Sequence, residues 1–134
     1  MLYTLPTKSI DITPHFTLNE FLSLDGEVVI DDLFWHHVEK LENLRVATGG
    51  PLIVTSGHRS ESHNKAVGGA PKSMHLKFAS DLQIGGKSST SGLDDLYKLA
   101  RAEGFSGIGR YNTFLHIDCR EFIGRTPAEW DNRT

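Results

Sequence analysis

The sequence predicts a single small α+β domain over residues 1–134, with an antiparallel sheet and helices packed on one side of it. Its length of 134 residues suits one compact core. Helical patterns lie at 31–48 and 93–103, and strand patterns lie at 52–55, 79–84, 107–111 and 113–119. Helical segments come first and strands follow with one helix inserted, an order that favours the α+β class.

The first half of the chain is predicted to be mainly helical. Residues 1–15 have no regular pattern, and 16–24 suggests a short helix capped by Thr17, with Glu20 at the capping-box position. A longer helix begins at Asp31 and ends before Gly49. Its apolar residues recur at near-helical spacing: Leu33, Val38, Leu41 and Leu44.

The second half is predicted to supply the sheet. The strand at 52–55 runs into a loop at 56–60, and 61–74 contains at most a short helix. A strand at 79–84 is followed by a Gly/Ser loop at 85–92 and by the helix 93–103, which Gly104 stops. The last two strands form a hairpin that turns near Asn112.

Composition excludes several classes of protein. A net charge of −3 gives no electrostatic reason to expect nucleic acid or an anionic membrane as partner. No apolar run reaches the roughly 18–20 residues that a membrane span needs, and we expect a monomer without membrane insertion. Cys119 is the single cysteine, so neither an internal disulfide nor a cysteine-based zinc cluster is possible.

The last predicted strand carries the clearest chemical signal. Side chains two residues apart share a face of a strand, so His116 and Asp118 lie together on the face opposite Leu115 and Ile117. The strand at 79–84 behaves similarly and presents Asp81 on its polar face. If both strands belong to one sheet, an imidazole and a carboxylate can converge, and His75 in the preceding turn is a third candidate.

Two histidines and one carboxylate are a common catalytic zinc set that leaves a fourth position for water. Zinc turns that water into a nucleophile near neutral pH and polarises a carbonyl group. Spacing alone leaves a second interpretation open, in which His116 and Asp118 form an ordinary hydrogen-bonded surface pair.

Longer motifs add a resemblance to a known family. The stretches TSGHRSESHNKAVGGAPKSMHLKFASDLQI and GIGRYNTFLHIDCR, with HFTLNEFL and ENLR upstream, resemble the D-alanyl-D-alanine carboxypeptidase-like zinc peptidases, family fifteen of the metallopeptidases. Their superfamily also contains phage L-alanyl-D-glutamate endolysins and the hedgehog fold. The resemblance covers about residues 15–120 and several motifs in the same order.

The resemblance implies a set of site residues. His75, Asp81 and His116 would bind Zn²⁺, and Arg59 would hold a carboxylate or carbonyl of the substrate through its bidentate guanidinium. Ser73 would support the ligands or bind substrate. The function that the resemblance implies is hydrolysis of a peptide bond in the stem peptide of peptidoglycan, by a D,D-carboxypeptidase or by a murein endopeptidase such as a phage endolysin.

The chain departs from the family pattern at two places. Five residues separate His75 from Asp81 where the family has six, and Phe78 stands where glycine is common. Many relatives carry an acid three residues before the last histidine, and Thr113 occupies that position here. We predict Asp118 as the substitute base, with a ligand-orienting role for Asp118 as the alternative. A protein that kept the metal and lost the base would be a zinc-stabilised module that binds the cell wall or a virion partner without cleaving.

Other conspicuous side chains receive weaker predictions. His36 and His37 are expected to pack or face solvent, because no zinc-binding helix motif surrounds them. His58 and His63 could line the cleft, although ordinary loop hydrogen bonds are expected more often. Trp130 is expected to pack against the core or the chain end. The N-terminus has no signal-peptide pattern, so we expect cytoplasmic synthesis and action at the cell wall or periplasm after release.

Overall fold

The computed structural model describes residues 2–4, 10–85 and 92–134, and its core element is a five-stranded sheet in the order β5-β6-β8-β7-β9. Neighbouring strands are antiparallel except for β7 and β9, which are parallel. The five strands have these bounds: β5 Leu52–Ser56, β6 Ala79–Ile84, β7 Gly107–Arg110, β8 Leu115–Asp118 and β9 Ala128–Asp131. The predicted α+β class is therefore confirmed, with one parallel pair at the edge of the sheet.

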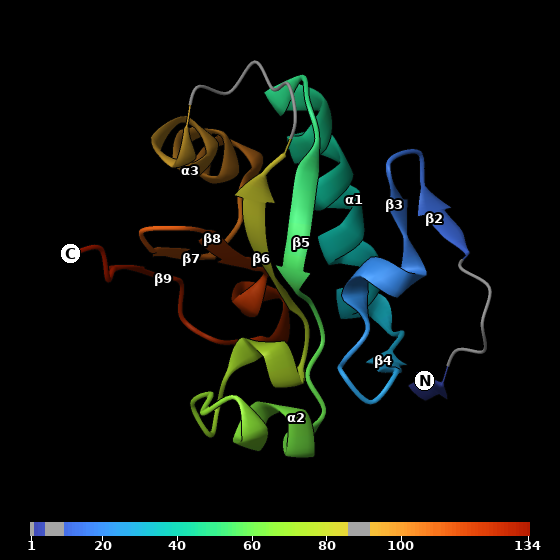
Figure 1. The fold of residues 1–134 in the computed structure, drawn as a ribbon. Helices are drawn as coiled ribbons and strands as arrows, with labels where there is room; N and C mark the ends of the chain where they lie inside the picture. The colour runs from blue at the N-terminus through green and yellow to red at the C-terminus, as the bar shows by residue number, and fades with distance from the viewer. Residues whose placement is uncertain (1, 5–9, 86–91) are drawn as a thin grey trace.

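Helices cover the apolar face of this sheet. Helix α1 (Asp32–Thr48) packs along it, and α3 (Leu93–Glu103) contacts α1, β7 and β8 (Figure 1). Asp31 caps α1 by accepting a hydrogen bond from the Phe34 amide, and Gly49 ends it in the left-handed conformation. His37 on α1 hydrogen-bonds Ser80 on β6, which places α1 on the Ser80 face and leaves Asp81 on the other.

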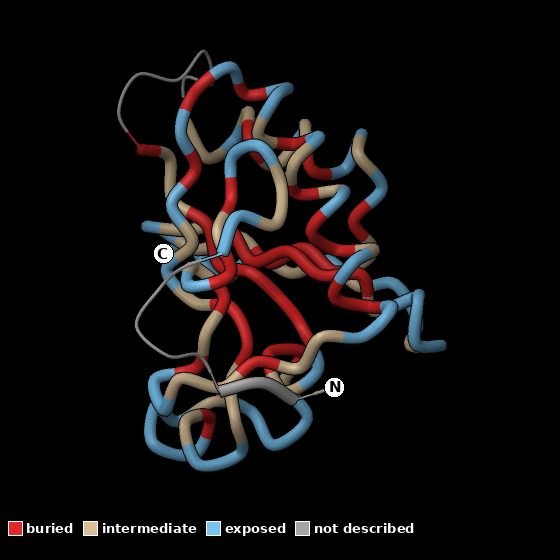
Figure 2. Tube along the Cα trace, turned by 90° about the vertical axis from the view of Figure 1, so that its right-hand side faces the viewer, coloured by how far each residue is buried: buried red, intermediate tan, exposed pale blue. Residues whose placement is uncertain are grey.

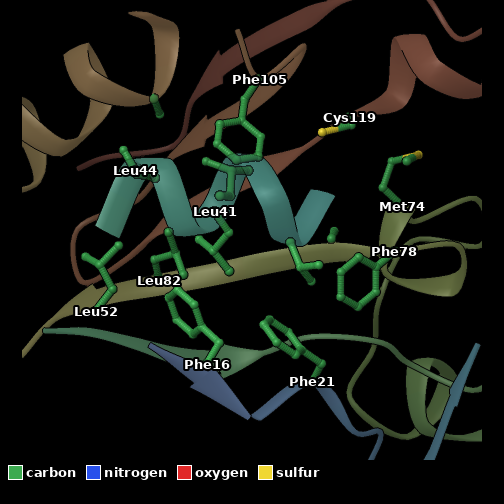
Figure 3. Close-up of a cluster of buried hydrophobic side chains, with 14 of the residues drawn as sticks. Phe16, Phe21, Leu41, Leu44, Leu52, Met74, Phe78, Leu82, Phe105 and Cys119 are labelled. Atoms are coloured by element: carbon green, nitrogen blue, oxygen red, sulfur yellow. The ribbon is translucent and has the colours of Figure 1, made fainter. Parts of the chain in front are cut away.

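The hydrophobic core lies between α1 and the central strands. Figure 3 shows Leu41 and Leu44 of α1 above Leu82 of β6, with Phe16, Phe21 and Phe78 beside them. In Figure 2 the buried residues gather along the central strands, and exposed residues occupy the turns at either end. Leu82, Ile108 and Ile117 are fully buried, so the inner face of the sheet is rigidly packed behind the strands that carry His116 and Asp81.

The remaining elements are short and lie mostly around the edges of the sheet. Helix α2 (Glu61–Ala66) and the 3-10 helix η2 (Met74–Leu76) form the end of the molecule below the sheet in Figure 1. Near the N-terminus, β1 (Leu2–Thr4) pairs with β4 (Glu27–Val29) and β2 (Asp11–Thr13) pairs with β3 (Phe16–Thr17). The other two 3-10 helices are η1 (Leu18–Phe21) and η3 (Arg120–Ile123).

Three sequence expectations need correction. The N-terminal part predicted as irregular contains β1 and β2, because strands of three residues are too short to show alternation. The predicted helix over 16–24 is β3 followed by one 3-10 turn, although Glu20 does accept the Thr17 amide as the capping box requires. No element is predicted after residue 119, whereas the structure has η3 and β9 there. Residues 86–91 of the predicted Gly/Ser loop lie outside the described residues.

In the part of the chain that the structure describes, no helix is both long and apolar enough to cross a bilayer.

Candidate metal centre

His75, Asp81 and His116 come together on the sheet face opposite α1. Asp81 on β6 and His116 on β8 are direct partners in the antiparallel register, so their side chains point to the same side. Asp81 Oδ1 lies 3.0 Å from His116 Nδ1 and 3.2 Å from His75 Nε2. All three residues are buried. The sequence prediction that these three side chains converge is therefore confirmed.

His75 is held by its backbone and by its ring. The Ser73 hydroxyl caps η2 by accepting the His75 amide, and the His75 carbonyl accepts the Arg59 amide. In the ring, Nδ1 lies 2.6 Å from the carbonyl oxygen of Gly57. Because a carbonyl can only accept, Nδ1 carries the proton. The lone pair of Nε2 therefore points toward Asp81 in the neutral ring.

His116 is oriented in the same way by a carboxylate. Its Nε2 lies 2.7 Å from Asp118 Oδ2, and the Arg120 guanidinium grips both oxygens of Asp118 at 3.0 and 2.8 Å. Asp118 is fully buried, and the backbone amide of Arg120 donates to it as well. An ionised carboxylate accepts only, so Nε2 donates and Nδ1 presents its lone pair to Asp81.

Two imidazole lone pairs and a carboxylate oxygen thus face one another, an arrangement that a cation must stabilise. The three ligand atoms lie within 4.8 Å of one another, a spacing that lets them bind one metal ion. Without a metal ion, the protonated His116 ring would donate to both Asp118 and Asp81; burial alone would lower the pKa of His116, but these two contacts raise it above the ordinary value. Burial would raise the pKa of Asp81, yet the two histidines lower it. The donor set fits Zn²⁺, for which nitrogen and oxygen ligands are typical.

The short spacing between His75 and Asp81 does not displace Asp81. Phe78, at the position where the family commonly has glycine, is fully buried and packs against Phe21, Phe34 and His37. The chain therefore leaves η2, anchors Phe78 in the core and enters β6 directly. This anchoring brings Asp81 into register with His116 despite the missing residue.

Arg59 and Ser73 line a cleft of about 420 Å³ that opens over His75 and His116. Arg59 lies 3.8 Å from Asp81 Oδ2, and its guanidinium also donates to Ser56 and Asn64 at 3.3 Å. It is mostly buried yet reaches the cleft, which suits a residue that positions substrate. The substrate-binding roles of Arg59 and Ser73 remain predictions.

Trp130 is the main site residue that the sequence prediction missed. Its ring lies over His116 with 5.1 Å between centroids, and its indole N–H donates to the Tyr111 hydroxyl at 2.9 Å. Gly109 on β7 is the register partner of His116 on β8 and of Trp130 on β9, and a Cβ at Gly109 would collide with the Trp130 ring. Glycine inside a strand is a signal that another group approaches the backbone closely, but it does not say which group.

The other histidines lie outside the cleft. His37 is fully buried, and burial lowers its pKa to about 3. His36 stacks on Phe122. His63 accepts from the Leu24 amide and bonds Ser23, an ordinary loop contact. His58 is buried beside a neighbouring depression, and its Nδ1 has no partner among the described residues.

The contacts of Asp118 favour the ligand-orienting role over the base. It lies on the Nε2 side of the His116 ring, whereas the metal-facing atom is Nδ1. Both of its oxygens are engaged by His116 and Arg120, and neither reaches solvent. Thr113 is exposed and does not line the cleft. The catalytic role of Asp118 stays a prediction.

Comparison with known proteins agrees with this geometry. A family model described as Peptidase M15 matches residues 14–118, well over half of the chain and all three candidate ligands. A search of curated proteins finds no match.

Proposed function

The chain belongs to the peptidase M15 family of metallopeptidases, and on this premise we propose that it is a zinc-dependent hydrolase of peptidoglycan stem peptides. We infer a D,D-carboxypeptidase or a murein endopeptidase, acting at the cell wall after release from the cytoplasm. The observation that carries the proposal is the convergence of His75 Nε2, His116 Nδ1 and Asp81 Oδ1 beside an open cleft.

The three ligands would hold Zn²⁺ with a position open toward the cleft. Zinc bound in this way polarises a carbonyl and lowers the pKa of water. The chain itself prepares the ligands: the Gly57 carbonyl and Asp118 fix the tautomers of His75 and His116, which keeps both lone pairs directed at the metal. Burial alone would raise the pKa of Asp118, but its hydrogen bonds with His116 and Arg120 lower that pKa, so the carboxyl stays ionised.

Arg59 would position the substrate next to the metal. Its guanidinium lies on the Asp81 side of the cleft and can donate two parallel hydrogen bonds to a peptide carboxylate or carbonyl. The Trp130 ring also lines the cleft and covers one side of the His116 imidazole.

A second candidate is a zinc-stabilised binding module without hydrolytic activity. The observation that favours it is the lining of the cleft: among the described residues that form it, none is Asp or Glu. A peptidase commonly uses a carboxylate as general base, and here the nearest buried carboxylates are engaged by the histidines.

Digestion of purified peptidoglycan separates the two candidates. The full chain, loaded with one zinc per molecule, is incubated with peptidoglycan with and without a chelator, and the products are identified by mass spectrometry. The hydrolase releases new amine termini only when zinc is present, and the product masses identify the bond. Intact zinc loading without any new termini would instead overturn the hydrolase and leave the binding module as the remaining candidate.

Variants of the ligands connect this activity to the site. His75→Ala, Asp81→Ala and His116→Ala should each lose zinc and activity together. His36→Ala is the matched control, because His36 stacks on Phe122 away from the cleft. If Asp81→Ala alone kept its zinc, the third ligand would be another residue.

A further inference from the structure

The cleft beside the candidate metal is basic although the chain as a whole is acidic. The net charge of the sequence is −3, yet among the described residues the charged side chains that line the cleft are all cationic: Arg59, Lys72, Arg120 and Arg125. A concave surface lined by one sign of charge concentrates ligands of the opposite sign. The cleft is therefore suited to an anionic ligand.

Two of these cations are neutralised within the protein and two are not. Arg120 pairs with Asp118 at 2.8 Å, and Arg59 lies 3.8 Å from Asp81. Lys72 and Arg125 form no ion pair with any carboxylate among the described residues. Two neighbouring cations without a counter-charge repel each other in the free protein, and a bound anion reduces that repulsion.

Lys72 and Arg125 are also held next to each other. The Arg125 guanidinium donates to the Lys72 carbonyl oxygen at 2.9 Å, which fixes it over the turn that leads to Ser73. Gly124 precedes Arg125 in the left-handed conformation and directs the chain out of η3 toward this turn. The half-buried Arg125 is thus preorganised, and the exposed Lys72 adds a second cation to the lining of the same cleft.

The pair lies at the junction of two hollows. The metal cleft and a second depression of about 440 Å³ share Arg59, Lys72, Ser73 and Arg125 as lining residues. A peptide that extends from the metal into the second depression would therefore pass these cations. Arg125 also lies outside the range 14–118 that the family model matches.

We propose that Lys72 and Arg125 form a second carboxylate-binding subsite, which selects peptide substrates that carry an acidic side group away from the bond being cleaved. This inference rests on the proposed function and deepens it, because stem peptides contain such groups. Arg125 provides a planar donor fork, and Lys72 provides a point charge. The subsite determines specificity, whereas the metal ligands and Arg59 engage the reacting part of the peptide.

The test compares peptides that differ by one carboxylate. The parent is L-alanyl-γ-D-glutamyl-meso-diaminopimelyl-D-alanyl-D-alanine. Two analogues carry a carboxamide in place of the D-glutamyl α-carboxylate or of the diaminopimelyl side-chain carboxylate. Dissociation constants by calorimetry and kcat/KM are measured on the zinc-loaded full chain for Lys72→Gln and Arg125→Gln. Lys65→Gln and Arg45→Gln serve as matched controls outside the cleft.

We expect one amidation to weaken binding to the unmodified chain by about three- to tenfold, the range for a partly exposed charged contact. In Lys72→Gln and Arg125→Gln the ratio of affinities for the parent peptide and the amide should fall toward one. The loss should appear in the KM for the parent peptide and not in kcat. The two control variants should keep the full preference, and added salt should reduce it.

The outcomes separate the two proposals. Hydrolysis without any preference between the parent and both amides would overturn the subsite and leave the proposed function intact. A carboxylate preference that depends on Lys72 and Arg125, without hydrolysis, would keep the subsite and overturn the hydrolase. Absence of both binding and hydrolysis would overturn both.

Discussion

Asp118 acts on the site through a histidine. Its carboxylate accepts from His116 Nε2 and is itself held by the Arg120 fork, so it controls where the Nδ1 lone pair points. Gly107 supports this contact, because a Cβ at that position would collide with the carboxylate. Asp118, Arg120 and Gly107 therefore act together to fix the His116 ring.

Asp118→Asn should reduce zinc affinity by about 10- to 100-fold, the usual cost of losing an orienting carboxylate. An amide can present its N–H to Nε2 and so permit the wrong tautomer of His116. Competition with a chromophoric chelator measures the zinc dissociation constant, and activity is measured at saturating zinc. Full zinc affinity combined with lost activity would instead assign Asp118 as the base.

His37 gives a pH dependence that is separate from the metal site. Burial lowers its pKa from 6.5 to about 3, so the unfolded chain binds a proton between these values and the folded chain does not. The stability from His37 is therefore complete above pH 6.5 and is lost as the pH falls toward 3. The slope reaches about 1.4 kcal/mol per pH unit within this window.

His37→Gln should flatten the dependence of unfolding free energy on pH between about 6.5 and 4.5. Glutamine can still bond Ser80, and it does not titrate. Urea unfolding is measured in the presence of a chelator, so that metal release does not contribute. The pKa of His116 is raised in the folded chain, so His116 stabilises the fold at low pH and opposes the effect of His37. Because His116 is present in both the variant and the parent, its contribution cancels when their unfolding free energies are subtracted. An unchanged slope would contradict a buried neutral His37.

At the scale of elements, β7 and β9 together build one wall of the site. Gly109 leaves room for the Trp130 ring, and the parallel pairing of β7 with β9 brings that ring over His116. The Arg120 guanidinium lies 5.1 Å from the Trp130 ring, so the aromatic side chain also covers the orienting cation. A strand at the sheet edge thus contributes one wall of the cleft beside the candidate metal centre.

Gly109→Ala should destabilise the fold by about 1–3 kcal/mol, because the added methyl group collides with Trp130. The double variant Gly109→Ala/Trp130→Ala should be less destabilised than the sum of the single variants, since removing the ring removes the collision. Denaturant unfolding of all four proteins measures this coupling. Additive effects would show that the two side chains do not contact.

The sequence predicted those elements whose pattern is local. The hairpin of β7 and β8 and the ligand face of β8 follow from alternation, and His75, Asp81 and His116 follow from alternation together with the family resemblance. Trp130, Lys72 and Arg125 could not be predicted in this way, because their place depends on β9 pairing in parallel across η3 and on the Arg125 contact with a distant turn. The four residues of β9 are too few to show a pattern that predicts its pairing, and no local pattern predicts a contact between Arg125 and a distant turn.

At the scale of the whole molecule, the three ligands connect η2 to two central strands. His75 and His116 are 41 positions apart in the sequence, and β6 and β8 carry buried core residues on their other face. Because the unfolded chain cannot hold the three groups together, zinc binds the native state in preference to the unfolded state. Zinc binding should therefore stabilise the whole domain.

We expect zinc at 100 times its dissociation constant to add about 2.7 kcal/mol to the free energy of unfolding, and a chelator to reverse this increase. Calorimetric melting in zinc and in chelator measures the shift. His116→Ala should melt at one temperature under both conditions, because the zinc-dependent part of its stability is lost. Arg125→Gln provides the contrast, since it removes a cation of the cleft without touching a ligand and should keep the full zinc-dependent shift. A wild-type melting temperature that is indifferent to zinc would contradict a metal site formed by these three residues.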